Sequence, residues 1–145
     1  MRAVIQRVTK ASVTIENSII ASIKAGLVIF LAIHQEDTED MIEKLADKIS
    51  KLRIFEDSNG KLNLSILDTG GEILLISQFT LYADCNQGNR PSFTDAADPV
   101  KAEKYYEKFI QALRAKNISV VTGKFKTNMQ ISLINDGPVT IILDL

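Results

Sequence analysis

The first 33 residues alternate polar with apolar positions and end in a long apolar run. Residues 2–6 (RAVIQ) and 12–16 (SVTIE) are rich in β-branched residues and partly alternate, whereas residues 26–33 (GLVIFLAI) are continuously apolar. Partial alternation is typical of a half-buried strand, and a short apolar run is typical of a strand buried on both faces. The pattern therefore predicts three strands, the third of them buried.

Two later segments show the 3.6-residue period of amphipathic helices. Asp37 or Thr38 is expected to cap the first helix, because a short polar side chain accepts the free amide hydrogens at a helix start. Asp98 is expected to cap the second, with Pro99 at its first position and Asn117 near its end. The predicted buried positions are Met41, Ile42, Leu45, Ile49 and Leu52 in the first helix and Ala102, Tyr105, Tyr106, Phe109, Ile110 and Leu113 in the second.

Turn-forming residues divide the rest of the chain into further strands and one long loop. LRIF at 52–55 predicts a short strand, and Asn59-Gly60 and Gly70-Gly71 predict breaks before a strand with the sequence EILLISQFTLYA. Residues 84–98 lack periodicity and predict a loop of a length that is often functional. Two segments, MQISLIN and VTIILDL, predict final strands on either side of Asp136-Gly137-Pro138.

The order β-β-β-α-β-β-β-α-β-β-β predicts an α/β fold. We expect a single domain over residues 1–145, with mixed sheets and two helices packed on one side in α/β/β layers, and with room for a second small sheet. A chain of 145 residues with 46% hydrophobic residues is large enough to bury a sizeable core.

Composition narrows the functional classes. The 17 basic and 18 acidic residues nearly cancel, which argues against a grip on long nucleic acid through many phosphates, so any RNA contact is expected to be short and local. With one cysteine and one histidine, neither a disulfide framework nor a Cys/His zinc site is expected. No apolar run would span a bilayer and no signal-peptide pattern is seen. A cytoplasmic protein without metal, cofactor or membrane contact is expected.

The sequence gives little support for a catalytic role of the side chains that commonly act as bases or nucleophiles. His34 follows a buried strand, where an ordinary strand-end polar residue is the commoner interpretation. Cys85 has no basic neighbour in sequence to activate it. The acidic residues are scattered rather than paired, which does not support a carboxylate dyad.

Two polar motifs at strand ends remain as candidates. In Ser77-Gln78-Phe79-Thr80 the polar side chains either alternate outward or form hydrogen bonds in the core, or else the backbone amides past the strand end form an oxyanion hole. Asn135-Asp136-Gly137-Pro138 is either a plain turn or a backbone surface for a ligand, because glycine has no Cβ and the bond before proline tolerates the cis form. The local pattern leaves these alternatives open.

These motifs resemble those of the D-aminoacyl-tRNA deacylase family. SQFTL at 77–81 and NDGPVT at 135–140 are similar to its two signature motifs. Further similar blocks occur in the same order and spacing, namely RAVIQRVTKASV, LRIFEDSNGKLNLSI, LYAD, GNRPSF and MQISLINDGPVTIILD. The resemblance covers nearly the whole chain.

The resemblance implies an enzyme that hydrolyses the ester joining a D-amino acid to tRNA, with glycyl-tRNA as a further candidate substrate, and so proofreads chirality in translation. It implies a homodimer in which the acceptor end of tRNA enters a pocket at the interface. A cis Gly137-Pro138 turn from the partner subunit would crowd out an L side chain. Arg7 matches the arginine that braces this turn, Asn135 belongs to the same motif, and Met129 lines the pocket.

The strand-end motif has implied roles as well. The amides of Gln78 and Phe79 would bind the ester carbonyl, Ser77 would shape the pocket, and Phe79 would lie beside the terminal adenosine. Two mechanisms of ester hydrolysis remain open. Either Thr80 acts as a nucleophile, or the ribose 2′-hydroxyl activates water. The lack of a usable histidine favours the hydroxyl.

Two other classes compete with this assignment. One is a covalent Ser/Thr esterase that acts through Thr80 or Ser77 and shows burst kinetics. The other is a non-catalytic protein that binds RNA ends, which the near-zero charge and the lack of an aromatic-basic cluster disfavour.

The chain departs from the family pattern next to Met129. Family members usually carry Gly-Ala where this chain reads Phe125-Lys126-Thr127-Asn128, and glycines are common where it has Asn17 and Ala32. The pocket shape and substrate range are therefore open. Three basic residues could contact phosphate or be ordinary surface charges, namely Arg90, Lys124 and Lys126.

Overall fold

The computed structural model describes residues 1–145 and is organised around one long strand. The first half of β1 (Arg2–Ile15) pairs antiparallel with β3 (Gly26–Ala32), and its second half pairs antiparallel with β2 (Ser18–Ile23). On its other side, β1 pairs over most of its length with β8 (Gln130–Asp144). The strand therefore joins two differently oriented parts of one sheet.

The sheet continues beyond β3 with parallel strands. β6 (Glu72–Ser77) runs parallel to β3, and β7 (Ser119–Thr122) runs parallel to β6. The order is β2-β1-β3-β6-β7, with β8 added to β1. A separate two-stranded sheet is formed by β4 (Phe55–Glu56) and β5 (Leu62–Leu64). The predicted mixed sheet with a small second sheet is confirmed.

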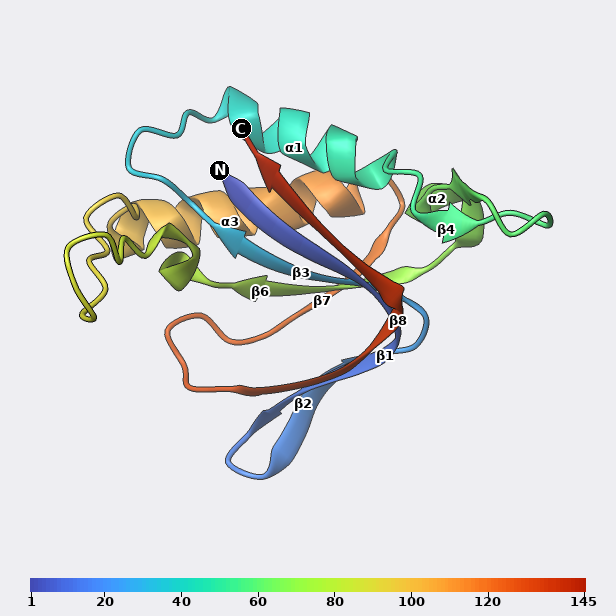
Figure 1. Cartoon of the computed structure of the whole chain (residues 1–145), viewed down its shortest axis with the longest axis horizontal. Coiled ribbons are helices and arrows are strands. Elements are labelled where there is room, and N and C mark those ends of the chain that lie inside the picture. The colour runs from blue at the N-terminus through green and yellow to red at the C-terminus, as the bar shows by residue number, and fades with distance from the viewer.

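The molecule has three layers (Figure 1). The helices α1 (Asp40–Ser50) and α3 (Pro99–Arg114) cover one face of β3 and β6, and the curled part formed by the second half of β1, β2 and the first half of β8 covers the other. A core cluster of 23 buried residues includes side chains of both helices, and a second cluster of 7 lies on the opposite face. Leu27 belongs to the first cluster and Val28 to the second. Because both faces of β3 are buried, its sequence is continuously apolar, and the predicted helices on one side are confirmed.

Several predicted strand boundaries are wrong. Residues 2–6 and 12–16 belong to the single strand β1, and the two C-terminal segments belong to the single strand β8. Register shifts between Gln6 and Val8 and between Val8 and Lys10 bend the ladder without ending it, because a bulge absorbs extra residues while pairing resumes beyond it. The segment LRIF contributes only Phe55 to a strand.

The predicted strand at 72–83 ends early, at Ser77. It is followed by the 3₁₀ helix η1 (Phe79–Tyr82). The short helix α2 (Ile66–Thr69) was not predicted, since four residues are too few to show a helical period. It carries a capping box in which Ser65 and Asp68 satisfy each other's backbone amides.

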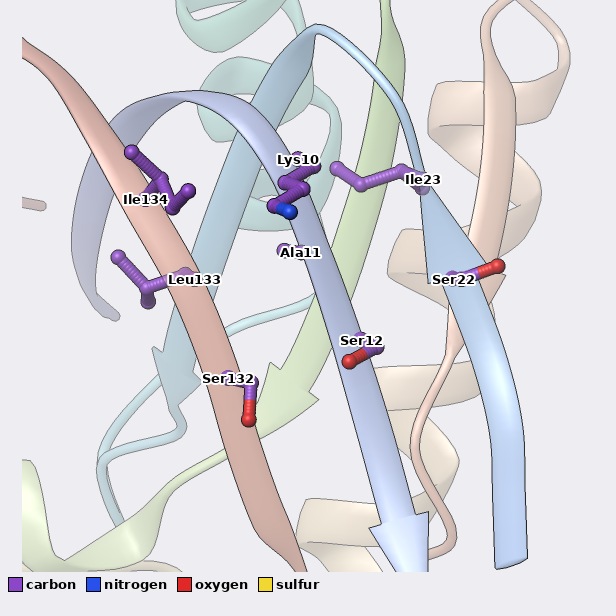
Figure 2. Close-up of a pocket in the computed structure, with 8 residues that line it drawn as sticks. All are labelled: Lys10, Ala11, Ser12, Ser22, Ile23, Ser132, Leu133 and Ile134. Carbon is purple, nitrogen blue, oxygen red and sulfur yellow. The ribbon is translucent and has the colours of Figure 1, made fainter.

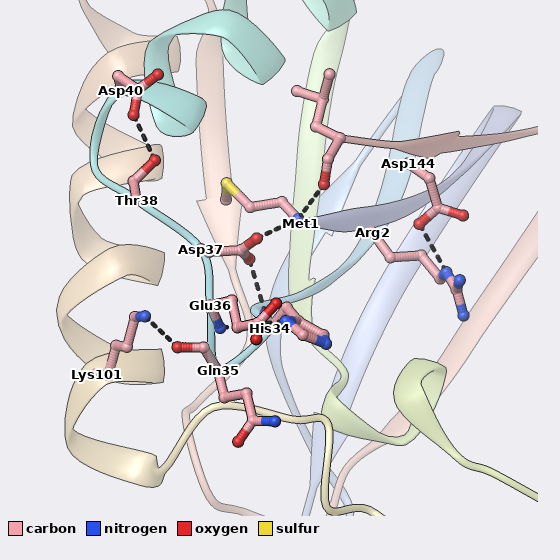
Figure 3. A network of polar contacts seen from close by, with 11 residues as sticks. Met1, Arg2, His34, Gln35, Glu36, Asp37, Thr38, Asp40, Lys101 and Asp144 are labelled. Carbon is pink, nitrogen blue, oxygen red and sulfur yellow. Dashed lines mark hydrogen bonds and ion pairs between the residues drawn. The ribbon is translucent and has the colours of Figure 1, made fainter.

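The predicted cap of the first helix is also wrong. Helix α1 begins at Asp40 after Glu39, with no side-chain cap. Asp37 is instead buried, accepting hydrogen bonds from the Met1 amino group at 2.6 Å and from the His34 amide at 2.7 Å (Figure 3). The Asp37 carboxylate therefore binds the Met1 amino group and the His34 amide, and not the amides at the start of α1.

The predicted start of the second helix is confirmed. The Asp98 side chain accepts hydrogen bonds from the amides of Val100 and Lys101, and Pro99 follows it. The helix ends at Arg114, and Asn117 has a positive φ of 61° in the following turn. None of the helices is long and apolar enough to cross a membrane.

A substitution at Gly26, the first residue of β3, tests the close contact between β3 and β6. A Cβ at this position would lie 1.9 Å from the backbone oxygen of Glu72, which belongs to the sheet and cannot move aside. We expect Gly26→Ala to lower the free energy of unfolding by about 3 kcal/mol, as measured by urea denaturation. Gly71→Ala is the matched control, since its Cβ would lie 3.3 Å from the Ala25 oxygen. Equal losses in the two variants would contradict this account of the strand contact.

Candidate active site

A cavity of about 810 Å³ opens at the C-terminal end of β6. Ligands of parallel sheets commonly bind beyond the carboxyl ends of the strands. The lining comes from the strand end, the loop before α3, the start of α3 and the segment before β8. Its residues are Ile76, Ser77, Gln78, Phe79, Phe93, Ala96, Ala97, Pro99, Ala102, Phe125, Lys126, Thr127, Asn128, Met129 and Ile131. Four of the predicted site residues, Ser77, Gln78, Phe79 and Met129, are thus brought together.

The backbone turns from strand to 3₁₀ helix at the edge of this cavity. The amide of Gln78 still belongs to the sheet, because it donates to the Leu31 carbonyl at 2.8 Å. The amides of Phe79 and Thr80 come first in η1, where no preceding helical carbonyl is available to them. Of the two amides expected to bind the ester carbonyl, that of Gln78 is already occupied, and that of Phe79 remains.

Thr80 lies outside the cavity lining. Its side chain is exposed, and its hydroxyl oxygen accepts a hydrogen bond from the side-chain amide of Gln78. No imidazole, carboxylate or thiol is present among the lining residues, whose only ionisable side chain is that of Lys126. The arrangement offers backbone donors and shape, not a nucleophile with its base.

Two tyrosines outside the cavity lining stay protonated at neutral pH. Burial, followed by the charges of Asp37 and Asp144, raises the pKa of Tyr82 to about 12. Burial also raises the pKa of Tyr106, whose hydroxyl donates to the Leu75 carbonyl at 2.8 Å. Neither phenol can therefore act as a general base near neutral pH.

The other candidates from sequence do not enter the cavity lining. The Nδ1 atom of His34 accepts a hydrogen bond from the Glu36 amide at 3.1 Å, and its ring packs edge-on against Tyr82. Cys85 is exposed and free. No group of three or more His, Cys, Asp or Glu residues is placed to hold a metal ion. These findings favour the structural interpretation of His34.

An exposed aromatic pair borders the cavity. The rings of Phe79 and Phe93 meet edge to face, with centroids 5.0 Å apart, and are 53% and 36% exposed. Apolar side chains of this size are normally buried, so their exposure marks a surface on which an unstacked base can pack. Sequence reasoning singled out the loop that carries Phe93, but not this residue.

The segment before β8 forms the opposite wall. The amide of Gly123 donates to the Leu75 carbonyl at 3.2 Å, and the amide of Lys124 lies 3.3 Å from the Met129 sulfur. A Cβ at Gly123 would lie 2.6 Å from the same sulfur. Glycine at position 123 therefore allows the Met129 thioether to pack there and line the cavity.

The second predicted motif forms a braced turn. The Gly137–Pro138 peptide bond is cis. The Asn135 side chain accepts from the Val139 amide at 2.7 Å and donates to its carbonyl at 3.1 Å. The buried Arg7 guanidinium donates to the Asp136 carbonyl at 2.9 Å. Asn135 and Arg7 thus hold the turn from behind, while residues 136–138 are exposed.

The two motifs lie at opposite ends of the sheet within one chain. Ser77 pairs with Leu31 near one end of β3, whereas Arg7 pairs with Leu27 near the other. At roughly 3.3 Å per residue these positions are about 13 Å apart along the strand. No residue of the 135–138 turn belongs to the cavity lining. Within one chain, the predicted site residues therefore lie in two separate groups.

A smaller hollow crosses the outer face of the curled sheet (Figure 2). It has a volume of about 360 Å³, and its walls include Ser12, Ser22 and Ser132 on three neighbouring strands. Lys10 is its only ionisable residue, and no base adjoins the serine hydroxyls among its lining residues. This hollow offers no catalytic constellation.

Comparison with known proteins gives consistent results. The sequence model of the family described as D-Tyr-tRNA(Tyr) deacylase matches residues 4–144. The D-aminoacyl-tRNA deacylase of Thermotoga petrophila is 55% identical over 99% of this chain and 97% of its own length. That of Dictyoglomus turgidum is 58% identical, over 99% and 92% respectively.

Solved structures agree on the fold. One described as c-Myc DNA Unwinding Element Binding Protein superposes with a TM-score of 0.94 at 42% identity, covering 100% of this chain and 99% of the other. Another, described as a probable eukaryotic D-amino acid tRNA deacylase, superposes with a TM-score of 0.86 at 14% identity, covering 99% and 98%. At that identity the second likeness concerns the fold alone.

Proposed function

Because the chain belongs to the D-Tyr-tRNA(Tyr) deacylase family, and is therefore a hydrolase, we propose that the cavity at the end of β6 hydrolyses the ester of D-aminoacyl-tRNA without a side-chain base. One observation carries this proposal. The motif residues Ser77, Gln78, Phe79 and Met129 line a cavity that contains no imidazole, carboxylate or thiol.

The acceptor end enters with its terminal base on the Phe79–Phe93 pair, which leaves the ester over the start of η1. The free amide of Phe79 donates to the ester carbonyl oxygen. It stabilises the negative charge that develops on this oxygen when water attacks the carbonyl carbon. A preorganised amide of this kind acts without any change of protonation, which suits a cavity whose lining contains no imidazole, carboxylate or thiol.

The proton transfers are then carried out by a group of the RNA. The 2′-hydroxyl of the terminal ribose accepts the proton of the attacking water and passes a proton to the 3′-oxygen as the ester bond breaks. Free D-amino acid and intact tRNA are released. The enzyme supplies position and dipoles, and the substrate supplies the proton relay.

The complete site is a shared one in a homodimer. The 136–138 turn is held from behind by Arg7 and Asn135 but is exposed at its tip, and it is remote from the cavity of its own chain. Exposed apolar residues flank it on β8, where Ile134 is 50% and Ile142 64% exposed, a surface suited to a second copy. The partner's turn then closes the cavity.

The closed site selects by chirality. Fixed backbone on one side of the substrate α-carbon leaves space for a D side chain and excludes an L side chain. Glycine, which has no side chain, passes as well. Acting in the cytoplasm, this selection removes D-amino acids from tRNA before they reach the ribosome. The near-zero net charge of the chain suits a contact limited to the acceptor end.

A pair of measurements tests this mechanism. Catalytic amounts of the enzyme are expected to release free D-tyrosine from D-tyrosyl-tRNA over many turnovers, which a protein that only binds RNA ends would not do. Replacing the terminal 2′-hydroxyl by hydrogen is expected to slow the reaction by about 100-fold or more, the usual contribution of positioned proton transfer. Thr80→Ala is expected to cost less than about fivefold, since Thr80 lies outside the cavity lining.

The reverse result would support the covalent esterase. In that case the 2′-deoxy substrate would react at the normal rate, Thr80→Ala would be inactive, and the wild type would show a burst of product. The 2′-deoxy tRNA must carry its amino acid on the 3′-oxygen in both experiments, so that the two esters differ in one atom.

A further inference from the structure

Lys126 combines an unusual backbone conformation with a position on the cavity wall. Its φ is +54°, in the left-handed region that residues with a Cβ rarely adopt. The Thr127 hydroxyl donates to the Phe125 carbonyl at 3.2 Å across this turn. Glycine would adopt the conformation without a steric penalty. The presence of lysine at a site that favours glycine directs attention to its side chain.

The charge of Lys126 is unbalanced in the protein. Lys126 is the only ionisable residue among those that line the cavity, it is exposed, and no carboxylate lies within ion-pairing distance of it. By contrast, Lys104, Lys108 and Lys116 on or next to α3 all pair with carboxylates of α1 or the residue before it. The lysine at the cavity is thus free to bind an anion from outside.

We infer that Lys126 binds the phosphodiester on the 5′ side of the terminal nucleotide and so positions the tRNA end over the cavity. This inference rests on the proposed function. The ester and this phosphate belong to the same nucleotide, so a substrate with its ester in the cavity brings the phosphate to the rim. An ammonium is a compact, flexible point charge that suits a single exposed phosphate. An exposed position favours this contact over a charged substrate side chain deep inside the cavity.

The test uses an RNA minihelix that ends in CCA and carries D-tyrosine. Lys126→Met removes the charge, and a neutral methylphosphonate in place of the last phosphodiester removes its partner. Each change alone is expected to raise KM by about threefold to fivefold and to leave kcat nearly unchanged. The two changes together are expected to cost no more than one of them. Either change should also reduce the slope of log KM against log salt concentration by about 0.7.

Three control variants separate the effect of the Lys126 charge from the effect of its backbone conformation. Lys126→Arg should retain most of the affinity. Lys126→Gly should lose affinity like Lys126→Met while raising the melting temperature by about 2–4 °C, because glycine relaxes the positive φ. Lys48→Met removes an exposed charge in the last turn of α1, away from the cavity, and should leave KM and the salt slope unchanged.

The proposal is overturned if the losses from Lys126→Met and from the methylphosphonate multiply, or if neither change raises KM. It is equally overturned if Lys126→Met slows release of D-aspartate but not of D-tyrosine, which would assign the lysine to the substrate side chain. These outcomes all require that the wild type hydrolyses the minihelix. Failure of that reaction would contradict the proposed function itself, so the two failures are distinguishable.

Discussion

Activity is expected to reappear when two inactive variants of this chain are mixed. The wall variant, Gln78→Ala/Phe79→Ala, removes side chains from the cavity. The turn variant, Gly137→Val, places a branched side chain at a φ of +134°, where a Cβ would lie 2.7 Å from the Val139 side chain. It therefore displaces the turn. If each site takes its wall from one subunit and its turn from the other, both homodimers are inactive.

Subunit exchange makes hybrid dimers that contain one subunit of each variant. One site of each hybrid then has both the mutated wall and the mutated turn, and the other site combines an intact wall with an intact turn. After random exchange about a quarter of all sites should be functional, by the two-fold symmetry of the dimer. The control mixes each variant with itself under the same exchange conditions. If the mixture stayed as inactive as its parents, the site would be complete within one chain, and the shared-site proposal would be wrong.

The layered fold could be predicted because its patterns are local. Strand β3 is buried on both faces and therefore reads as one apolar run, and the apolar faces of α1 and α3 repeat with the helical period. Asp98 caps α3 as expected because no distant group competes for its carboxylate. Where such a competitor exists, as the Met1 amino group does for Asp37, local reasoning fails.

Strand continuity could not be predicted for a similar reason. Residues 7–11, which include Arg7, Thr9 and Lys10, look like a break in the sequence. Strand β1 nevertheless continues through them, because β8 pairs along both halves and bulges absorb the change of direction. Pairing partners more than a hundred residues away decide whether a strand ends. The missed helix α2 is, in contrast, simply too short for periodicity to reveal.

The candidate site was found by motif and completed by tertiary structure. Resemblance identified Ser77, Phe79 and Met129, which the fold brings to one cavity. No local pattern could show that the Gln78 amide belongs to the sheet or that Phe93 packs against Phe79, because both contacts join residues that are distant in the sequence. The unpaired charge of Lys126 likewise becomes visible only when every nearby carboxylate is located.

The rate of ester hydrolysis on matched D- and L-tyrosyl-tRNA is the most direct test of the central claim that this cavity removes D-amino acids from tRNA. A side chain forced against fixed backbone costs about 3 kcal/mol, which corresponds to a rate difference of more than about 100-fold. We therefore expect kcat/KM for the D ester to exceed that for the L ester by at least this factor, with glycyl-tRNA close to the D ester. Equal rates on the D and L esters, or no hydrolysis of either above the uncatalysed rate, would contradict the account.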